Sequence, residues 1–328
     1  MMKAYARLYI DGEWIRTGRE ISPLINPYSQ EVIGEQVLAT PTDVERALQS
    51  AFEAKNIIKA IPAYKRAQVL KAVARNLEAE KEPFAKLITA ELGKPLKNTL
   101  DEVSRSIETL ELSAEEAKRL TGETSYGEAS PRGMGAIAAT FRVPVGVVAA
   151  ITPFNAPLNL ICHKIGPAYA AGNSVILKPA PQTPLIATRL LELLLESGFH
   201  PKSINLLLGG AAVGRQMVKD ARVNVVSFTG GVTAGRNICE TAGMKKVLLE
   251  LGGNAPTIVH EDADIQYAAA ECAKSGYSNS GQSCISVQRM YVHHAVIHAF
   301  VDHLKQAVSR LQVGDPCSLE SDIGCMVD

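Results

Sequence analysis

The sequence predicts an α/β protein in which helices cover a parallel sheet on both faces. Between residues 145 and 249, apolar runs alternate with helical stretches, and this alternation is the pattern of a parallel sheet. The apolar runs are continuous, as in strands that are buried on both faces. We expect strands at residues 145–151, 174–177, 204–208, 223–228 and 247–249, with helices near 159–171, 183–197, 211–220 and 233–242.

A second α/β unit begins near Gly252 and is incomplete. Val313-Gly314-Asp315-Pro316 starts a further connection with little chain left to complete it. We therefore predict two domains, residues 1–251 and residues 252–328, which the length of 328 residues allows. The expected elements of the second unit are strand 256–260, helix 264–279, strand 287–292 and helix 296–312.

The composition excludes two classes of partner. Lysine plus arginine and aspartate plus glutamate both number 34, and no basic stripe indicates a nucleic-acid or anionic membrane surface. The N-terminus lacks the apolar core of a signal peptide. The most apolar run, 143–152, is too short to span a bilayer. The six cysteines lack CxxC spacing, so we expect free thiols and a cytoplasmic location.

The N-terminal part predicts a hairpin followed by helices. Asp11-Gly12 separates two short apolar runs and is a hairpin signal. Thr42-Asp43-Val44-Glu45 reads as a capping box that opens a helix to about Ala60. Helices near 64–80 and 83–92 follow, and a longer one starts near Leu96 and ends near Gly122.

A ribbon at residues 123–143 interrupts this order. Its first part is polar and glycine-rich, and Ile137, Ala139, Phe141 and Val143 then alternate with other residues as in an exposed strand. Such a ribbon could pair with another subunit. An ordinary edge hairpin fits the pattern equally well.

Chemically interesting residues follow the expected strands. In parallel sheets, ligands bind beyond the carboxyl ends of the strands. Those ends carry Thr152–Asn155, Lys178–Ala180, Gly209-Gly210 and Phe228–Gly231. Gly230–Gly235 also opens a helix, where N–H groups can hold a phosphate. Its match to the dinucleotide fingerprint is imperfect, and a plain tight turn fits as well.

Cys284 and Glu250 are candidates for a nucleophile and its base, because each is flanked by glycine in apolar surroundings. A buried cysteine is more often only a small hydrophobe. Asn155 could donate to an oxyanion or be a turn asparagine. Lys164 is either a helix-face charge or part of the site. Lys178 could bind a phosphate or ribose, or it could be a surface lysine whose ammonium reaches solvent.

A histidine-rich stretch near the expected helix 296–312 does not predict a metal site. The histidines are His293, His294, His298 and His303. His294 and His298 are four residues apart and could share a helix face, but His293-His294 falls at a strand-to-helix junction. No HExxH pattern occurs. We therefore predict no metal.

Taken together, the motifs resemble the NAD(P)-dependent aldehyde dehydrogenase superfamily over essentially the whole chain. This implies an aldehyde-dehydrogenase-like fold: a Rossmann-type dinucleotide-binding domain with an oligomerisation hairpin at 123–143, then the start of a catalytic domain. The motifs that carry the resemblance are Ile151-Thr152-Pro153-Phe154-Asn155, Gly172-Asn173, Lys178-Pro179-Ala180, Phe228-Thr229-Gly230, Glu250-Leu251-Gly252-Gly253 and Gly281-Gln282-Ser283-Cys284.

The resemblance implies roles for these residues. Cys284 would add to the aldehyde, while Asn155 and the Cys284 N–H hold the oxyanion. Hydride would pass to NAD or NADP, and Glu250 would activate the water that hydrolyses the thioester. Lys164 matches a lysine near the site. The implied cofactor contacts are Ile151, Thr152, Pro153, Phe154, Lys178, Pro181, Gly210, Gly214, Phe228, Thr229, Gly230, Gly231, Gly235, Leu251 and Gly252.

Departures from the family pattern refine the expectation. Pro181 stands where NAD-selective members often carry glutamate, so a 2′-phosphate should be less repelled. Ala156, Leu160 and His163, with Asn159 nearby, replace aromatic tunnel residues. This suggests a short, polar aldehyde, as in the lactaldehyde and non-phosphorylating glyceraldehyde-phosphate branch. Some phosphate-using members carry an arginine just before the cysteine, and here that position is Ser283.

Two alternatives remain. A CoA-acylating relative would pass the acyl group to a thiol, although that branch commonly lacks the glutamate found at Glu250. Family members also continue well past Cys284, so we expect a C-terminally truncated chain. An inactive binding or structural fragment is therefore the second alternative. For the full-length protein we expect a homo-dimer or homo-tetramer.

Overall fold

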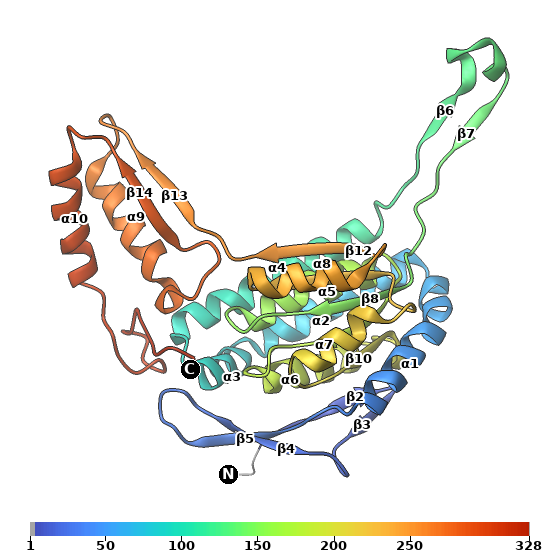
Figure 1. Ribbon diagram of the computed structural model, residues 1–328, viewed down its shortest axis with the longest axis horizontal. Coiled ribbons are helices and arrows are strands. Elements are labelled where there is room, and N and C mark those ends of the chain that lie inside the picture. The colour runs from blue at the N-terminus through green and yellow to red at the C-terminus, as the bar shows by residue number, and fades with distance from the viewer. Residues whose placement is uncertain (1–3, 328) are drawn as a thin grey trace.

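The computed structural model describes residues 4–327 and is built around a seven-stranded sheet (Figure 1). Five neighbouring strands are parallel, which confirms the predicted fold class. The N-terminal hairpin extends this sheet, since β2 pairs antiparallel with β10; the sequence did not predict that addition. The strand order is β12 (Lys246–Leu251), β11 (Val225–Gly230), β8 (Val147–Ile151), β9 (Ser174–Lys178), β10 (Ile204–Leu206), β2 (Leu8–Ile10) and β3 (Glu13–Ile15).

Helices cover both faces of the sheet. Every residue of β8 and β9 is buried, which explains why their sequences are apolar without alternation. One layer contains α1 (Pro41–Ala60), α7 (Ala211–Lys219) and α8 (Val232–Ala242). The other contains α5 (Pro157–Ala170) and α6 (Pro184–Glu196), backed by α2 (Ala63–Ala79), α3 (Lys81–Leu92) and α4 (Leu96–Ala117).

The cap of α1 differs from the predicted one. Thr40, not Thr42, is the N-cap residue, and the helix begins at Pro41. Thr40 Oγ1 accepts from the Asp43 N–H at 3.2 Å, and Asp43 Oδ2 accepts from the Thr40 N–H at 2.9 Å. The predicted box of Thr42 and Glu45 is therefore wrong. Proline suits the first helical position because its missing N–H would be unpaired there anyway.

Among the described residues, three small sheets lie outside the main one, and two of them belong to the first unit. The strands β1 (Ala4–Ala6), β5 (Val32–Val37) and β4 (Ile21–Ile25) form a sheet that the sequence analysis did not predict. The strands β6 (Thr124–Tyr126) and β7 (Ile137–Ala139) form a hairpin that protrudes from the body of the molecule (Figure 1). The expected strand through Val143 is too long, because Phe141 and Val143 lie in the exposed connection behind the hairpin.

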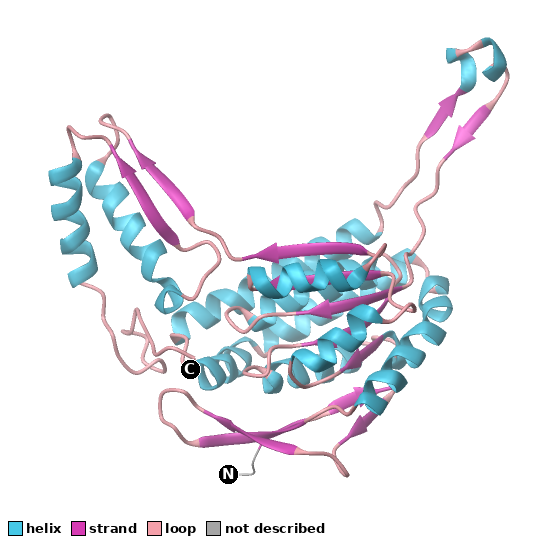
Figure 2. Cartoon of the chain, viewed as in Figure 1, coloured by secondary structure: helices cyan, strands magenta, loops and turns pink. Residues whose placement is uncertain are grey.

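The second unit has its own small core. The strands β13 (Ala255–Val259) and β14 (Val287–Val292) pair in parallel, and α9 (Ile265–Tyr277) packs against them and against α10 (Ile297–Ser309) (Figure 2). After α10 the chain returns to the first unit, where the Leu96 N–H donates to the Pro316 carbonyl at 2.8 Å. The fully buried residues of this core are Val259, Ala269, Cys272 and Phe300.

Among residues 4–327, no helix is both long and apolar enough to cross a membrane. The division of the chain at residue 251 stays a prediction, although β12 ends at Leu251 within the main sheet and β13 begins at Ala255 in the other.

Because so few residues form the second core, we predict that Phe300→Ala unfolds this unit selectively. Phenylalanine-to-alanine changes in cores cost about 3–5 kcal/mol. Hydrogen exchange should show lost protection in β13, β14 and α9 while β8 and β9 keep theirs. Val301→Ala, on the more exposed side of the same helix, is the control. Equal protection in both variants would contradict the assignment of a separate core.

Candidate active site

A cavity of about 380 Å³ lies beyond the carboxyl ends of β8, β9 and β11. It brings together most of the residues expected to contact the cofactor. Two cations, Lys178 and Arg215, line it, and its lining contains no aspartate or glutamate. The lining residues are Ile151, Thr152, Pro153, Phe154, Lys178, Ala180, Pro181, Gly210, Ala211, Gly214, Arg215, Val218, Phe228, Thr229, Gly230, Gly231, Ala234, Asn237, Ile238 and Thr241.

Lys178 is the buried cation of this cavity. Its side chain is 6% exposed, and Nζ donates to the Pro179 carbonyl at 3.1 Å. Desolvation by burial lowers its pKa to about 8. Because the cavity lining offers no carboxylate, an anionic group on a ligand is the partner that fits.

Two helix N-termini open onto the same cavity. Gly210 is the N-cap of α7 and Gly231 is the N-cap of α8, and neither cap makes a side-chain hydrogen bond. A Cβ atom at either glycine would meet nothing within 4 Å. The unpaired N–H groups of a first helical turn bind phosphate well. The residues present therefore fit a dinucleotide.

The expected cofactor contact at Gly235 stays a prediction, and packing gives this glycine a further role. Gly235 is not in the cavity lining, and a Cβ atom there would lie 2.7 Å from Leu251 Cδ2. Glycine at this position lets α8 approach β12. Three polar lining residues, Arg215, Asn237 and Thr241, were not predicted from the sequence. The four-residue spacing of the last two on α8 is a signal that places them on one helix face.

Cys284 lines a second cavity of about 280 Å³. Its lining includes Asn155, Leu251 and Gly252, with Gln282 and Ser283 beside the cysteine. Leu251 and Gly252 were expected to contact the cofactor, and they lie in this cavity and not in the cationic one. The two cavities share a wall. The shared residues are Pro153, Phe154, Thr229, Gly230 and Gly231.

The loop before Cys284 has an unusual backbone. Asn279, Ser280 and Gly281 have φ of 52°, 58° and 76°, in the left-handed region that non-glycine residues rarely adopt. Strained backbone of this kind persists where surrounding contacts enforce it, often at functional sites. Asn155 supplies one such contact, because its Nδ2 donates to the Gln282 carbonyl at 3.0 Å. The candidate amide donor and the cysteine loop are thus in direct contact.

Lys164 reaches the sheet from α5. Its Nζ donates to Thr229 Oγ1 at 2.8 Å and to Ser227 Oγ at 3.2 Å. Desolvation lowers its pKa to about 8, and the charge of Glu250 opposes that shift. Thr229 is the register partner of Glu250, so their side chains stand on the same face of the sheet.

Glu250 lies near the end of β12 and is exposed. The residues just after it, Leu251–Gly253, line the cysteine cavity, but Glu250 itself does not. Since side chains alternate along a strand, Glu250 faces away from the side on which Leu251 meets α8. Its carboxylate therefore stands on the face of the sheet that carries Thr229, where its charge acts on Lys164.

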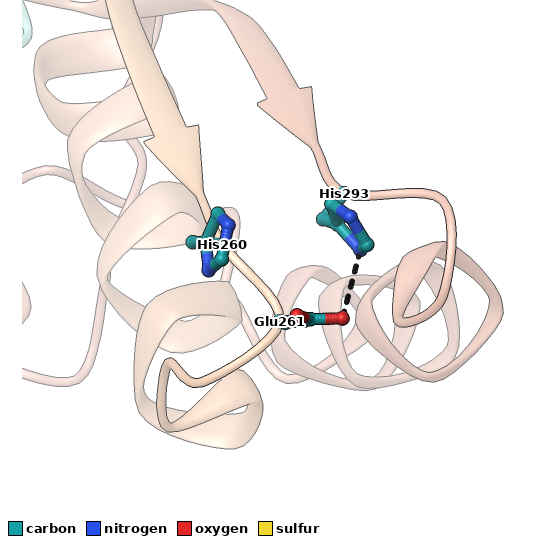
Figure 3. Close-up of side chains that lie close together, drawn as sticks. All are labelled: His260, Glu261 and His293. Atoms are coloured by element: carbon teal, nitrogen blue, oxygen red, sulfur yellow. Dashed lines mark ion pairs between the residues drawn. The ribbon is translucent and has the colours of Figure 1, made fainter.

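A separate cluster of possible metal ligands lies at the other end of the second unit. His260, Glu261 and His293 follow β13 and β14 and point toward one another (Figure 3). Their ligand atoms lie within 4.8 Å of one another. The prediction of no metal considered His293 without His260 or Glu261. All three are at least partly exposed, and Glu261 Oε2 lies 3.5 Å from His293 Nδ1. Exposed acidic groups commonly gather in this way without an ion, so the cluster does not by itself indicate a metal site.

Comparison with known proteins matches the chain to one family. The model of the aldehyde dehydrogenase family matches residues 14–328. The 3-sulfolactaldehyde dehydrogenase of Priestia aryabhattai is 45% identical over 98% of this chain and 67% of that protein. The lactaldehyde dehydrogenase of Methanococcus maripaludis is 41% identical over 98% of this chain and 68% of that protein.

A solved structure gives the same result. The NADP-dependent glyceraldehyde-3-phosphate dehydrogenase of Bacillus halodurans, complexed with NADP, has a TM-score of 0.95 and 37% identity. The match covers all of this chain and 69% of that one. The chain thus spans about two thirds of the length of these relatives.

The charge on Lys178 predicts a pH-dependent affinity for NADP⁺. The ammonium attracts an anion only while protonated, so affinity should fall by up to about tenfold as the pH rises from 7 to 9.5, through the pKa of about 8. The Lys178→Met variant should bind NADP⁺ more weakly, and its affinity should depend less steeply on pH. Titration by quenching of protein fluorescence measures both, with Lys219→Met at the exposed end of α7 as control. The pKa of Lys164 is also about 8. If the pH dependence of affinity were undiminished in Lys178→Met, it would be assigned to Lys164.

Proposed function

This chain belongs to the aldehyde dehydrogenase family, and on that premise we propose that it oxidises a short, polar aldehyde to a carboxylic acid with NAD⁺ or NADP⁺. The observation that carries the proposal is the wall shared by the cysteine cavity and the cationic cavity. A substrate held on Cys284 is thereby next to a pocket that suits a dinucleotide. Related solved structures hold NAD⁺ or NADP.

The residues of the chain divide the reaction into two steps. Cys284 Sγ adds to the carbonyl carbon, and Asn155 Nδ2 and the Cys284 N–H stabilise the oxyanion of the thiohemiacetal. The dinucleotide, when bound, supplies the hydride acceptor. Hydride loss leaves a thioester on Cys284. Glu250 takes a proton from water as the water attacks the thioester carbon, which releases the acid and the thiol.

The start and first turns of α5 support a small substrate. Ala156 and Leu160 are partly exposed and His163 is exposed. Asn159 does not contribute, because it is 2% exposed and its Oδ1 accepts from Thr109 on α4 at 3.2 Å. The proposal of a hydroxylated or similarly polar aldehyde therefore rests on the absence of phenylalanine, tyrosine and tryptophan at these positions. The names of the lactaldehyde and sulfolactaldehyde relatives agree with it.

We also propose that the protein acts in the cytoplasm as a homo-dimer or homo-tetramer. All six cysteines are free, as expected of a reducing compartment. The hairpin of β6 and β7 carries the apolar residues Tyr126, Met134 and Ile137, which are 72%, 67% and 68% exposed. Burial against another subunit would remove this surface from water.

The lining of the cationic cavity predicts that both dinucleotides bind. The Pro181 side chain has no acceptor for the hydroxyls of the adenosine ribose, and no carboxylate in the lining repels a 2′-phosphate. Titration with NAD⁺ and NADP⁺ at matched ionic strength should give comparable affinities. A preference for NAD⁺ above about a hundredfold, roughly 2.7 kcal/mol, contradicts this prediction.

The roles of Cys284 and Glu250 predict different failures. Cys284→Ala should abolish hydride transfer, because no thiohemiacetal can form. Glu250→Gln should still yield up to one reduced cofactor per site and then stall as an acyl-enzyme. Loss of general-base help lowers steady turnover by about 10²–10⁴-fold.

Rapid mixing with a short hydroxyaldehyde, followed by intact-mass measurement, shows the burst and the adduct. Absence of both in Glu250→Gln would place the carboxylate at an earlier step. Turnover of Glu250→Gln at the native rate would remove Glu250 from the reaction.

The exposed hairpin predicts a change of oligomeric state. Replacing residues 123–142 with a short turn should produce monomers, because the apolar arm is lost. Light scattering after size exclusion measures the mass. Unchanged mass would show that the hairpin does not hold the subunits together.

A further inference from the structure

We propose that the buried ion pair of Lys94 and Glu102 positions Asn155 for catalysis. The inference rests on the proposed function, since it concerns the amide that holds the oxyanion. Lys94 Nζ donates to Glu102 Oε2 at 2.6 Å, and the two side chains are 9% and 2% exposed. A buried charge pair is costly unless further hydrogen bonds satisfy it. The other hydrogen bonds of the Lys94 ammonium and the Glu102 carboxylate therefore show which part of the chain the pair holds in place.

Glu102 supplies the cap that α5 lacks. The N-cap residue, Ala156, makes no side-chain hydrogen bond, and Pro157 follows it. Glu102 Oε1 accepts from the Leu158 N–H at 2.9 Å and the Asn159 N–H at 3.3 Å. These are the groups that an N-cap side chain normally binds, and the helix dipole favours a carboxylate there. A residue of α4 thus fixes the start of α5, directly after Asn155.

Lys94 acts on Asn155 itself. Its Nζ donates to the Asn155 carbonyl at 3.3 Å, and Asn279 Nδ2 from the cysteine loop donates to the same oxygen at 3.3 Å. Donors from two parts of the chain therefore hold this one carbonyl. With the backbone fixed, the Asn155 side chain is directed at the cysteine loop, where it meets Gln282.

The pair acts through Asn155 and not on the substrate. Neither Lys94 nor Glu102 lines the cavity of Cys284 or the cationic cavity. Both are therefore positioning residues. A displacement of about 1 Å at a catalytic group can cost roughly a hundredfold in rate, so loss of the pair should slow the chemical step and leave cofactor binding nearly unchanged.

The test is Lys94→Met in the full chain. The rate of the first hydride transfer should fall about 10- to 100-fold, while the Kd for NADP⁺ changes by less than about threefold. In an Asn155→Ala background, Lys94→Met should cost nothing further, because residues that act as a unit are not additive. Lys86→Met, which removes an exposed ion pair with Glu82 on α3, should change neither quantity.

Additive losses, or a parallel loss of cofactor affinity, would show a merely structural role and overturn the proposal. If Lys94→Met does not fold because Glu102 is left unpaired, the neutral pair Lys94→Met with Glu102→Gln keeps the volume and an acceptor for α5. This double variant should show the same fall in the rate of the first hydride transfer as Lys94→Met.

A second readout does not need activity. The side-chain amide NMR signals of Asn155, assigned by their absence in Asn155→Ala, should shift or broaden in Lys94→Met and not in Lys86→Met. Unchanged signals would overturn the positioning role. If the wild-type chain transfers no hydride from short hydroxyaldehydes, the proposed function fails, and the NMR comparison still decides the role of Lys94.

Discussion

The alignment of the carboxyl ends of β8, β9 and β11 is the constraint on which the site depends. Parallel pairing places Ile151 beside Lys178 and beside Phe228 in register. The loops that follow the three strands must therefore meet at one edge. Because both faces of the sheet are covered, a lysine at this edge is buried among backbone groups and apolar walls. The cation of Lys178 and the helix N-termini at Gly210 and Gly231 give this edge its preference for an anion.

The second half of the site is built around α5. Asn155 precedes this helix and Lys164 lies on it, so the placement of one helix sets the position of both. On one side Lys164 reaches Thr229 across the sheet. On the other, α4 holds the start of α5 through Glu102. The cysteine loop then bonds to Asn155, which joins the second unit to the first at the point where the chemistry is proposed.

Local patterns predicted local structure well. The alternation of apolar strands and helices between residues 145 and 249 predicted the sheet, because its central strands β8 and β9 are buried over their whole length. The same patterns failed where neighbours decide the outcome. Thr40 caps α1 in place of Thr42 because Pro41 fixes the first turn. The packing role of Gly235, and the approach of His260 to His293, depend on contacts between elements. Lys94 and Glu102 carry no motif that connects them to Asn155, and only the fold brings them to it.

The central claim is that hydride leaves a substrate bound to Cys284 and enters a dinucleotide in the adjoining cavity. An aldehyde deuterated at its carbonyl carbon tests this directly. After a single turnover with NADP⁺, mass spectrometry should find the deuterium in the reduced dinucleotide, in an amount equal to the acid formed. The Cys284→Ala variant should give neither labelled dinucleotide nor acid. Deuterium released into the solvent, or label transfer that persists without the Cys284 thiol, would contradict the account.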